Sequence, residues 1–177
     1  MKTYLLSMLL FSLLCFISCD FGLTGDEDED LTELEKLPPL TTTGENTFGY
    51  LINGKSIIVR NTIFQVAIFQ QGQLQLGGGV DINDVDQGVT MILGDPLNIN
   101  QFYTFNSSDS INARYYINSV DISCRSEFAD TYDGSIMFSK IDRTNFIVSG
   151  FFDFSTVTES CDTLRITEGR FDLQYTP

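Results

Sequence analysis

The feature that most restricts the fold of this chain is the spacing of its turn residues. In TFGYLINGKSIIV (residues 47–59) the dipeptide Asn53-Gly54 separates two apolar runs, and this dipeptide tolerates the positive φ angles of a tight hairpin turn. The segment 73–76, QLQL, alternates polar and apolar residues, and Gly94-Asp95-Pro96 ends another short run. No segment after residue 40 shows a helical period. The pattern therefore predicts short β-strands joined by tight turns.

The last run, TLRITEGRFDLQY, changes phase along its length. Leu164 and Ile166 are even-numbered, whereas Phe171, Leu173 and Tyr175 are odd-numbered. Because a one-residue slip turns every side chain of a strand over to the other face, we predict a bulge or a sharp bend at Gly169.

The strand signals recur at close spacing along the whole domain. They predict nine or ten short strands with no helices between them, and 15 Phe and seven Tyr are available to fill an interior. Such a chain folds as an all-β domain. We expect an antiparallel meander that forms a sandwich or a barrel, and the sequence leaves these two alternatives open.

The N-terminus, MKTYLLSMLLFSLLCFISC, has one Lys followed by an apolar run from Tyr4 to Ile17. A membrane-spanning helix needs roughly 20 apolar residues, whereas a secretory signal needs a basic start, a shorter apolar stretch and a small residue at the cleavage point. Ser18 is that small residue and Cys19 follows it. Residues 1–18 are therefore predicted to be a cleaved signal peptide.

Phe16-Ile17-Ser18-Cys19 resembles the lipobox that ends the signal of bacterial lipoproteins, although the family usually has Leu where this chain has Phe16. The resemblance implies that Cys19 becomes the N-terminus and carries acyl chains such as palmitate. Because stable anchoring takes two chains or more, a tri-acylated Cys19 would hold the protein permanently at a membrane.

The segment that follows Cys19 is strongly acidic. Residues 20–36 contain eight acids and one Lys, and Pro38-Pro39 closes the segment. Like charges extend a chain and Pro stiffens it, so we expect residues 19–40 to be a flexible tether and residues 41–177 to be one domain. Residues 26–30 are similar to the acidic export signal of Bacteroidota-type surface lipoproteins, which implies an outer-membrane protein that faces the medium. The alternative is a solvated tail that carries no export signal.

Three stretches extend this resemblance into the domain: TTTGENTFGYLINGK, GSIMFSKIDRTNFIVSGFFDF and ITEGRFDL. They are similar to a small, uncharacterised family of β-rich lipoproteins from the same bacterial group, over residues 37–175. The family has no assigned activity, so the resemblance implies class and location and identifies no catalytic residue.

Two cysteines, Cys124 and Cys161, lie in the domain. In an oxidising compartment they are expected to form a disulfide, which would close a loop of about 38 residues and contribute about 3–4 kcal/mol by chain entropy. The alternative is two buried free thiols.

The chain contains no His and has a formal net charge of −14. The lack of His excludes Ser-His-Asp and Cys-His catalysis and His-containing zinc sites, and the acidic balance makes nucleic acid an unfavourable partner. We expect no enzyme activity and no cofactor. A pair of carboxylates of the glycosidase type stays open as an alternative.

Four further patterns have a chemical and a structural interpretation. The segment 81–86, DINDVD, would offer Asp81, Asp84 and Asp86 to Ca²⁺, but it lacks EF-hand order, and an Asx-stabilised turn is the preferred interpretation. LGGGV (residues 76–80) lacks the Lys of a phosphate loop, so it indicates close backbone approach.

Tyr115 and Tyr116 are expected to point to opposite faces of a strand, where they either pack or contact a sugar. Asp109-Ser110-Ile111 resembles an O-glycosylation acceptor of this bacterial group, as does the weaker candidate around Thr163.

The expected function is non-catalytic binding of a glycan, a peptide or a neighbouring envelope protein. Such a module predicts an exposed groove or patch with outward aromatic residues. A structural subunit of an envelope complex predicts a long unpaired strand edge or a large apolar patch. A hydrolase predicts a cleft with two convergent carboxylates, one of them with a raised pKa.

Overall fold

The computed structural model describes residues 31–105, 110–118, 127–158 and 161–177, which form ten strands and two short 3-10 helices. The strands are β1 (Thr47–Ile52), β2 (Lys55–Ile58), β3 (Gln65–Gln70), β4 (Gln73–Ile82), β5 (Val85–Gly94), β6 (Phe102–Thr104), β7 (Ile111–Asn118), β8 (Thr131–Asp142), β9 (Ile147–Thr158) and β10 (Cys161–Gln174). The 3-10 helices are η2 (Thr62–Phe64) and η3 (Phe128–Asp130).

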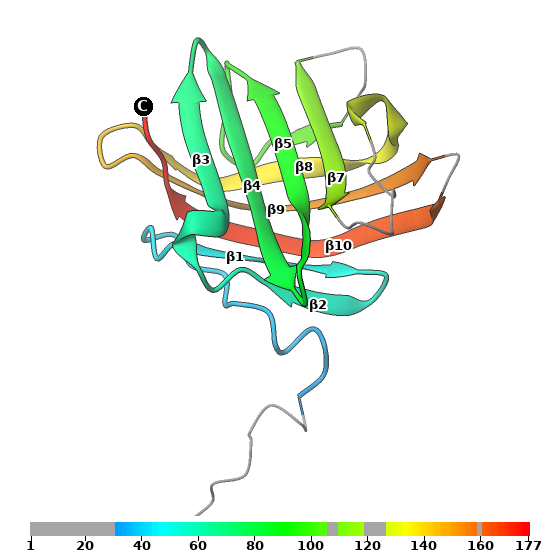
Figure 1. Ribbon diagram of the computed structural model, residues 1–177. Coiled ribbons are helices and arrows are strands. Elements are labelled where there is room, and N and C mark those ends of the chain that lie inside the picture. The colour runs from blue at the N-terminus through cyan, green and yellow to red at the C-terminus, as the bar shows by residue number, and fades with distance from the viewer. Residues whose placement is uncertain (1–30, 106–109, 119–126, 159–160) are drawn as a thin grey trace, which may run out of the picture. The chain divides into compact units, whose positions relative to one another are not determined.

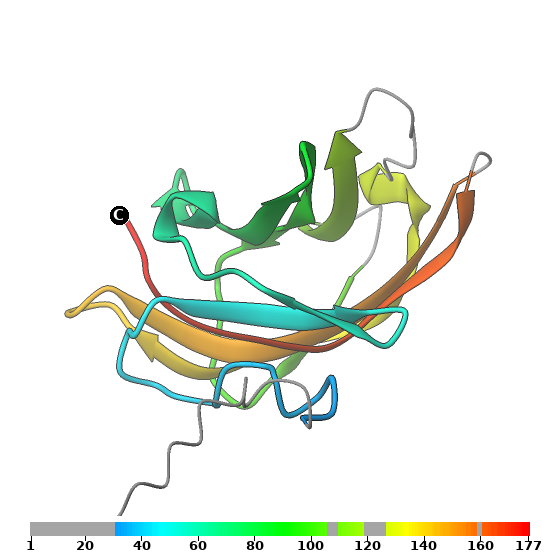
Figure 2. The same cartoon turned by 60° about the horizontal axis from the view of Figure 1, so that its bottom comes forward.

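The strands form two separate antiparallel sheets that pack face to face (Figures 1 and 2). The six-stranded sheet has the order β2-β1-β10-β9-β8-β6, and the four-stranded sheet has the order β3-β4-β5-β7. Neither ladder returns to its first strand within the described residues, so the domain is a sandwich and not a closed barrel. The prediction of an all-β antiparallel domain is confirmed. Of the two architectures that the sequence left open, sandwich and barrel, the structure has the sandwich.

The connectivity follows a meander only in part. The runs β3-β4-β5 and β8-β9-β10 pair in sequence order, as a meander predicts. β1 and β2 also form a hairpin, but three pairings skip strands: β1 pairs with β10, β5 with β7, and β6 with β8 in the six-stranded sheet. These pairings fix the N-terminal and C-terminal strands of the domain side by side in the middle of the six-stranded sheet.

Alternating residues of both sheets build one core, which is rich in aromatic rings. Phe48 and Phe152 have ring centroids 5.5 Å apart, and Phe138 packs edge-on against Phe171 at 5.9 Å. The core needs small residues where the sheets approach closely, because a Cβ added at Gly78 would lie 2.5 Å from the Phe48 ring. The expectation of close approach in the Gly-rich run is therefore confirmed.

Two local predictions are also confirmed. Asn53 and Gly54 have φ angles of +48° and +82°, which suit the tight turn between β1 and β2. The register between β9 and β10 shifts between Ile166 and Gly169, and Glu168 takes a φ of +53° there. This bulge turns the strand over, so that Ile166 and Phe171 both face the core.

The compact unit that contains the sandwich begins ten residues before the predicted boundary between tether and domain. Residues 31–40 belong to the same compact unit as the sandwich, which spans Leu31–Pro177. Leu37 is buried, and Glu33 is hydrogen-bonded to β2. Local composition suggested an extended, solvated segment, but specific contacts with the sheet fix it. Residues 19–30 lie outside the described ranges.

Candidate functional site

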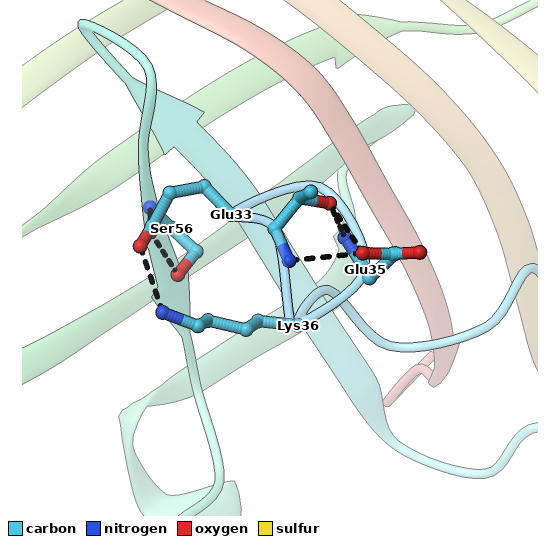
Figure 3. Close-up of polar contacts among 5 residues, drawn as sticks. Glu33, Glu35, Lys36 and Ser56 are labelled. Carbon is cyan, nitrogen blue, oxygen red and sulfur yellow. Dashed lines mark hydrogen bonds and ion pairs between the residues drawn. The ribbon is translucent and has the colours of Figure 1, made fainter. Parts of the chain in front are cut away.

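The outer face of the six-stranded sheet is crossed by an N-terminal arm, which we define as residues 31–46 (Figure 2). Its first anchor is Glu33, at the edge strand β2. Both the backbone N–H and the hydroxyl of Ser56 donate to Glu33 Oε2 at 2.7 Å, and Lys36 Nζ donates to Oε1 at 2.8 Å (Figure 3). Hydrogen bonds from Lys36 and then from Ser56 lower the pKa of Glu33 to about 2. Glu33 thus occupies a backbone donor that an open strand edge would present to another chain.

The second anchor holds the middle of the arm over β1 and β10. Pro38 packs directly over Gly49, where an added Cβ would lie 2.7 Å from the proline ring. Arg170 on β10 donates from Nη1 to the Pro38 carbonyl at 3.4 Å. Leu37 is buried beside this contact. Gly49 is therefore needed for close approach of the arm.

The third anchor is Asp172 of β10, which is buried under the end of the arm. Oδ1 accepts from Gly44 N–H at 2.8 Å and from the Ser149 hydroxyl at 2.6 Å. Oδ2 accepts from the Thr41 hydroxyl at 2.7 Å and from the N–H groups of Thr43 and Glu45 at 3.0 and 3.2 Å. Burial acts to raise the pKa of Asp172, but the hydrogen bonds outweigh it, so that the pKa lies below its usual value.

Beyond the arm, the same outer face carries a row of three apolar residues, of which one is exposed and two are half-buried. Phe102 of β6 pairs with Met137 of β8, and Met137 pairs with Phe151 of β9. Their sequence neighbours Tyr103, Ile136 and Phe152 are buried in the core, so the alternation of a strand turns the three row residues outward. Phe102 is 65% exposed. We refer to Phe102, Met137 and Phe151 as the outer row.

A groove with a volume of about 510 Å³ continues the outer row toward the bulge of β10. Phe151 lies in it together with Leu40 of the arm, and Asp153, Glu168 and Arg170 supply its charges. Arg170 is paired with Glu168 at 3.3 Å, and the Ser135 hydroxyl donates to Asp153 at 3.1 Å. The groove therefore offers an apolar floor beside carboxylate oxygens, an arrangement that binds a ligand with an apolar face and hydrogen-bond donors.

The acidic residues proposed as calcium ligands lie in a hairpin. Asn83 and Asp84 form the turn between β4 and β5 with φ angles of +54° and +64°, and Asp81 pairs with Asp86 across the ladder. In the described part of the chain, no three His, Cys, Asp or Glu side chains are grouped so that they could hold a metal ion. The turn interpretation accounts for this segment.

The two neighbouring tyrosines of β7 have structural positions. Tyr115 is buried, and its hydroxyl donates to Gln87 at 2.8 Å. Tyr116 lies over two glycines of the next strands, because a Cβ at Gly79 or Gly88 would collide with its hydroxyl oxygen. Their opposite orientations confirm the alternation, and their contacts favour packing over sugar binding.

The remaining candidate residues are only partly within the described ranges. Cys19 and Cys124 lie outside them, and Cys161 is the first residue of β10, so lipidation and the disulfide stay predictions. Ser110 is exposed immediately before β7, and Thr163 is exposed within β10. Glycosylation at either residue also stays a prediction.

The perturbed carboxyl groups do not have the signature of a general acid. Hydrogen bonds lower the pKa of Glu35 and hold that of Asp142 at about 2, the largest contributions coming from Thr32 and Asn145 respectively. An ion pair with Arg143, 2.7 Å long, lowers the pKa of Asp95. With Glu33 and Asp172, all these shifts favour the ionised form, whereas an acid catalyst needs a raised pKa.

No helix in the described ranges is both long and apolar enough to cross a lipid bilayer. Comparisons with protein-family models, curated proteins and solved structures gave no match.

Neither the groove nor the arm was predicted from the sequence, although the sequence holds a signal for one of them. The alternation of NFIVSGFFDFST places Phe151 and Asp153 on the face opposite Phe152, so the sequence contains a signal for the groove floor. The arm was not predicted, since its partners Ser56 and Asp172 are 23 and more than 120 residues away from the arm residues that they contact.

Proposed function

We propose that this chain is a non-catalytic binding module of the bacterial cell envelope, held at the outer membrane by acyl chains on Cys19 and facing the medium. In this proposal the outer row and its groove form the binding surface. The ligand is a glycan, a peptide or a neighbouring envelope protein that presents apolar groups beside hydrogen-bond donors.

The outer row is the observation that carries this proposal. The solvent face of a sheet in a sandwich ordinarily carries polar residues, and a contiguous apolar patch on such a face is a feature of interaction sites. Phe102 is 65% exposed and contributes little to the core. Its position on the edge strand β6, beside Met137 and Phe151, therefore supports a role in contact with another molecule.

The alternatives receive less support. A hydrolase needs a carboxyl group with a raised pKa, and the resolved shifts of the described carboxyl groups are all downward. A subunit that assembles by strand addition needs open edges. One edge of each sheet is partly covered, because Glu33 accepts from the N–H of Ser56 on β2 and Thr176 exchanges backbone hydrogen bonds with Ala67 and Phe69 on β3. The other two edges are β6, which has only three residues, and β7.

Binding is tested by measuring the affinity of the purified protein for a panel of soluble extracellular polysaccharides and for a peptide library. Phe102→Ala should weaken any interaction found about tenfold or more, as expected for an aromatic anchor. Ile82→Ala is the matched control, because Ile82 is also exposed but lies in the β4–β5 hairpin. Equal affinities for the two variants would rule out the outer row as the binding surface.

Location is tested by protease shaving of intact cells, with a C-terminal tag followed in the membrane fraction. Loss of the tag, with a periplasmic control untouched, is the expected result. Full protection would contradict an outward orientation, and release of a Cys19→Ala variant from membranes would support the acyl anchor.

A further inference from the structure

A second apolar surface lies where the chain crosses from one sheet to the other. Helix η2 carries Ile63, which is 76% exposed, and Phe64, which is 40% exposed. On the following strand β3, Ile68 is exposed and Val66 is partly exposed. We call these four residues and Arg60 the crossover tip. None of its four apolar side chains belongs to the buried core.

The crossover tip is held in a fixed conformation. The Asn61 side chain accepts from Ile63 N–H at 3.1 Å and so caps the 3-10 turn, and the Asn61 carbonyl accepts from Phe64 N–H at 3.1 Å. The Gln65 amide donates to the carbonyls of Asn46 and Val59 at 2.8 and 3.0 Å. These bonds tie the turn to the ends of β1 and β2, so Ile63 projects from a braced loop.

The charge around the crossover tip differs from that of the rest of the chain. The chain has 24 acids and a formal net charge of −14, yet residues 46–80 contain no Asp or Glu at all. Arg60 is exposed and is the cation of the crossover tip, whereas Lys55 lies at the far end of β2, beside the β1–β2 turn. An exposed acid, Glu45, directly precedes Asn46, whose carbonyl accepts from Gln65. The crossover tip therefore combines apolar side chains with the single positive charge of Arg60, whereas the outer row lies beside Asp153 and Glu168.

The size of the crossover tip decides which partner suits it. A stable protein interface buries about 800 Å² on each partner, or some 20–30 residues a side, and four projecting side chains are far too few. A lipid surface has no such requirement, because a few apolar residues can enter the boundary between headgroups and acyl chains while a nearby cation meets lipid phosphate.

We propose that the crossover tip is a membrane-contact site, through which Ile63 and Phe64 enter the interfacial region of a lipid bilayer and Arg60 contacts phosphate groups. The remaining acidic surface is repelled by anionic lipid, so this contact orients the domain. The inference depends neither on the ligand of the outer row nor on acylation of Cys19.

The chain contains no Trp, which makes a single introduced Trp a clean reporter. The mature chain from residue 19, with Cys19→Ser so that no acyl chain is present, is prepared as an Ile63→Trp variant and as a Phe102→Trp control. Each is mixed with vesicles of phosphatidylcholine and phosphatidylglycerol, with and without brominated acyl chains. For Ile63→Trp, the emission should shift to shorter wavelength and be quenched by brominated lipid, whereas the Phe102→Trp emission should change in neither respect.

Co-sedimentation with the same vesicles gives an independent measurement. The double variant Ile63→Asp and Phe64→Asp should lose at least about tenfold in partitioning, since the burial of two apolar side chains is lost. Ile82→Asp, at another exposed turn, should partition as the parent chain does. Absence of any shift for Ile63→Trp, or equal losses for both Asp variants, would overturn the proposal. So would a shift that depends on protein concentration without lipid, because it would identify a second copy of the chain as the partner.

Discussion

Replacing Asp172 with Ala is expected to lower the free energy of unfolding by about 3–5 kcal/mol, because a buried hydrogen-bond network loses its central acceptor. Five donors converge on this carboxylate, three of them backbone N–H groups at 2.8–3.2 Å. The Ala variant leaves these donors without an acceptor beneath the arm, and each unsatisfied buried group costs about 1–3 kcal/mol. The end of the arm should then separate from the sheet and regain water, which limits the loss to the stated range.

Asp172→Asn removes the charge of this side chain but keeps its shape. An amide oxygen placed at the Oδ2 position keeps the hydrogen bonds from Thr41, Thr43 and Glu45. The amide NH₂ then faces Ser149, whose hydroxyl can rotate to accept, and Gly44 N–H, which it cannot satisfy. With one orphaned donor and no charge-assisted bonds, the expected loss is about 2–3 kcal/mol.

The pH dependence provides a sharper test than the loss itself. The pKa of Asp172 is lowered in the folded protein, so its contribution is fully present above the unfolded pKa of about 3.9 and disappears as pH falls through the folded pKa. A protonated Asp172 resembles Asn. The stability difference between the parent chain and Asp172→Asn should therefore be constant from pH 7 to about pH 5 and shrink below about pH 4.

Urea denaturation at a series of pH values measures this difference, with unchanged m-values as the sign that only stability has changed. Asp153→Asn is a suitable control, because Asp153 is exposed on the same face and accepts one bond from Ser135; it should change stability by less than about 0.5 kcal/mol. The assignment of Asp172 as an ionised anchor would be refuted if the stability difference between the parent chain and Asp172→Asn stayed unchanged down to pH 3. It would also be refuted if this difference were no larger than the one measured for Asp153→Asn.

Three further changes test the core and the predicted disulfide. Tyr50 has a buried hydroxyl that lacks a hydrogen-bond partner among the described residues, and burial raises its pKa; Tyr50→Phe should therefore leave thermal stability unchanged or raise it by up to about 1–2 kcal/mol, and a clear loss would reveal a hidden partner. Gly78→Ala should cost about 1–3 kcal/mol in urea denaturation, because its methyl group would meet the Phe48 ring; a neutral effect would mean that the sheets can separate slightly. Replacing Cys124 and Cys161 by Ser should cost about 2–4 kcal/mol if they form the predicted disulfide, and a thiol assay on the denatured parent chain should detect no free thiol from this pair.

Features encoded by neighbouring residues were predictable from the sequence. The turn at Asn53-Gly54 depends on two residues that tolerate positive φ, and the bulge near Gly169 depends on a change of phase within one strand. Both signals lie within about ten residues. The class of the fold was predictable for the same reason, since each strand carries its own alternation.

Features that depend on distant residues were not predictable. The alternation in FDLQY correctly predicts that Asp172 points away from the core, which contains Phe171 and Leu173. Such a position is ordinarily exposed to solvent. The arm then buries Asp172, and nothing near residue 172 indicates that residues 41–45 will cover it. The acidic composition of residues 26–36 likewise suggested a solvated tether, whereas Glu33 forms hydrogen bonds with the edge of β2.

The distribution of charge explains how this domain can keep two apolar surfaces exposed. Exposed aromatic rows and tips normally favour self-association, but copies of a chain with a net charge of −14 repel one another. The repulsion is long-range, whereas the apolar contacts act only at close approach, so two copies are kept apart before the outer row or the crossover tip can meet. A neutral glycan experiences no such repulsion at the outer row, and at an anionic lipid surface the exposed Arg60 supplies an attraction to phosphate at the crossover tip. The same net charge that disfavours self-association thus leaves both surfaces available to the partners proposed for them.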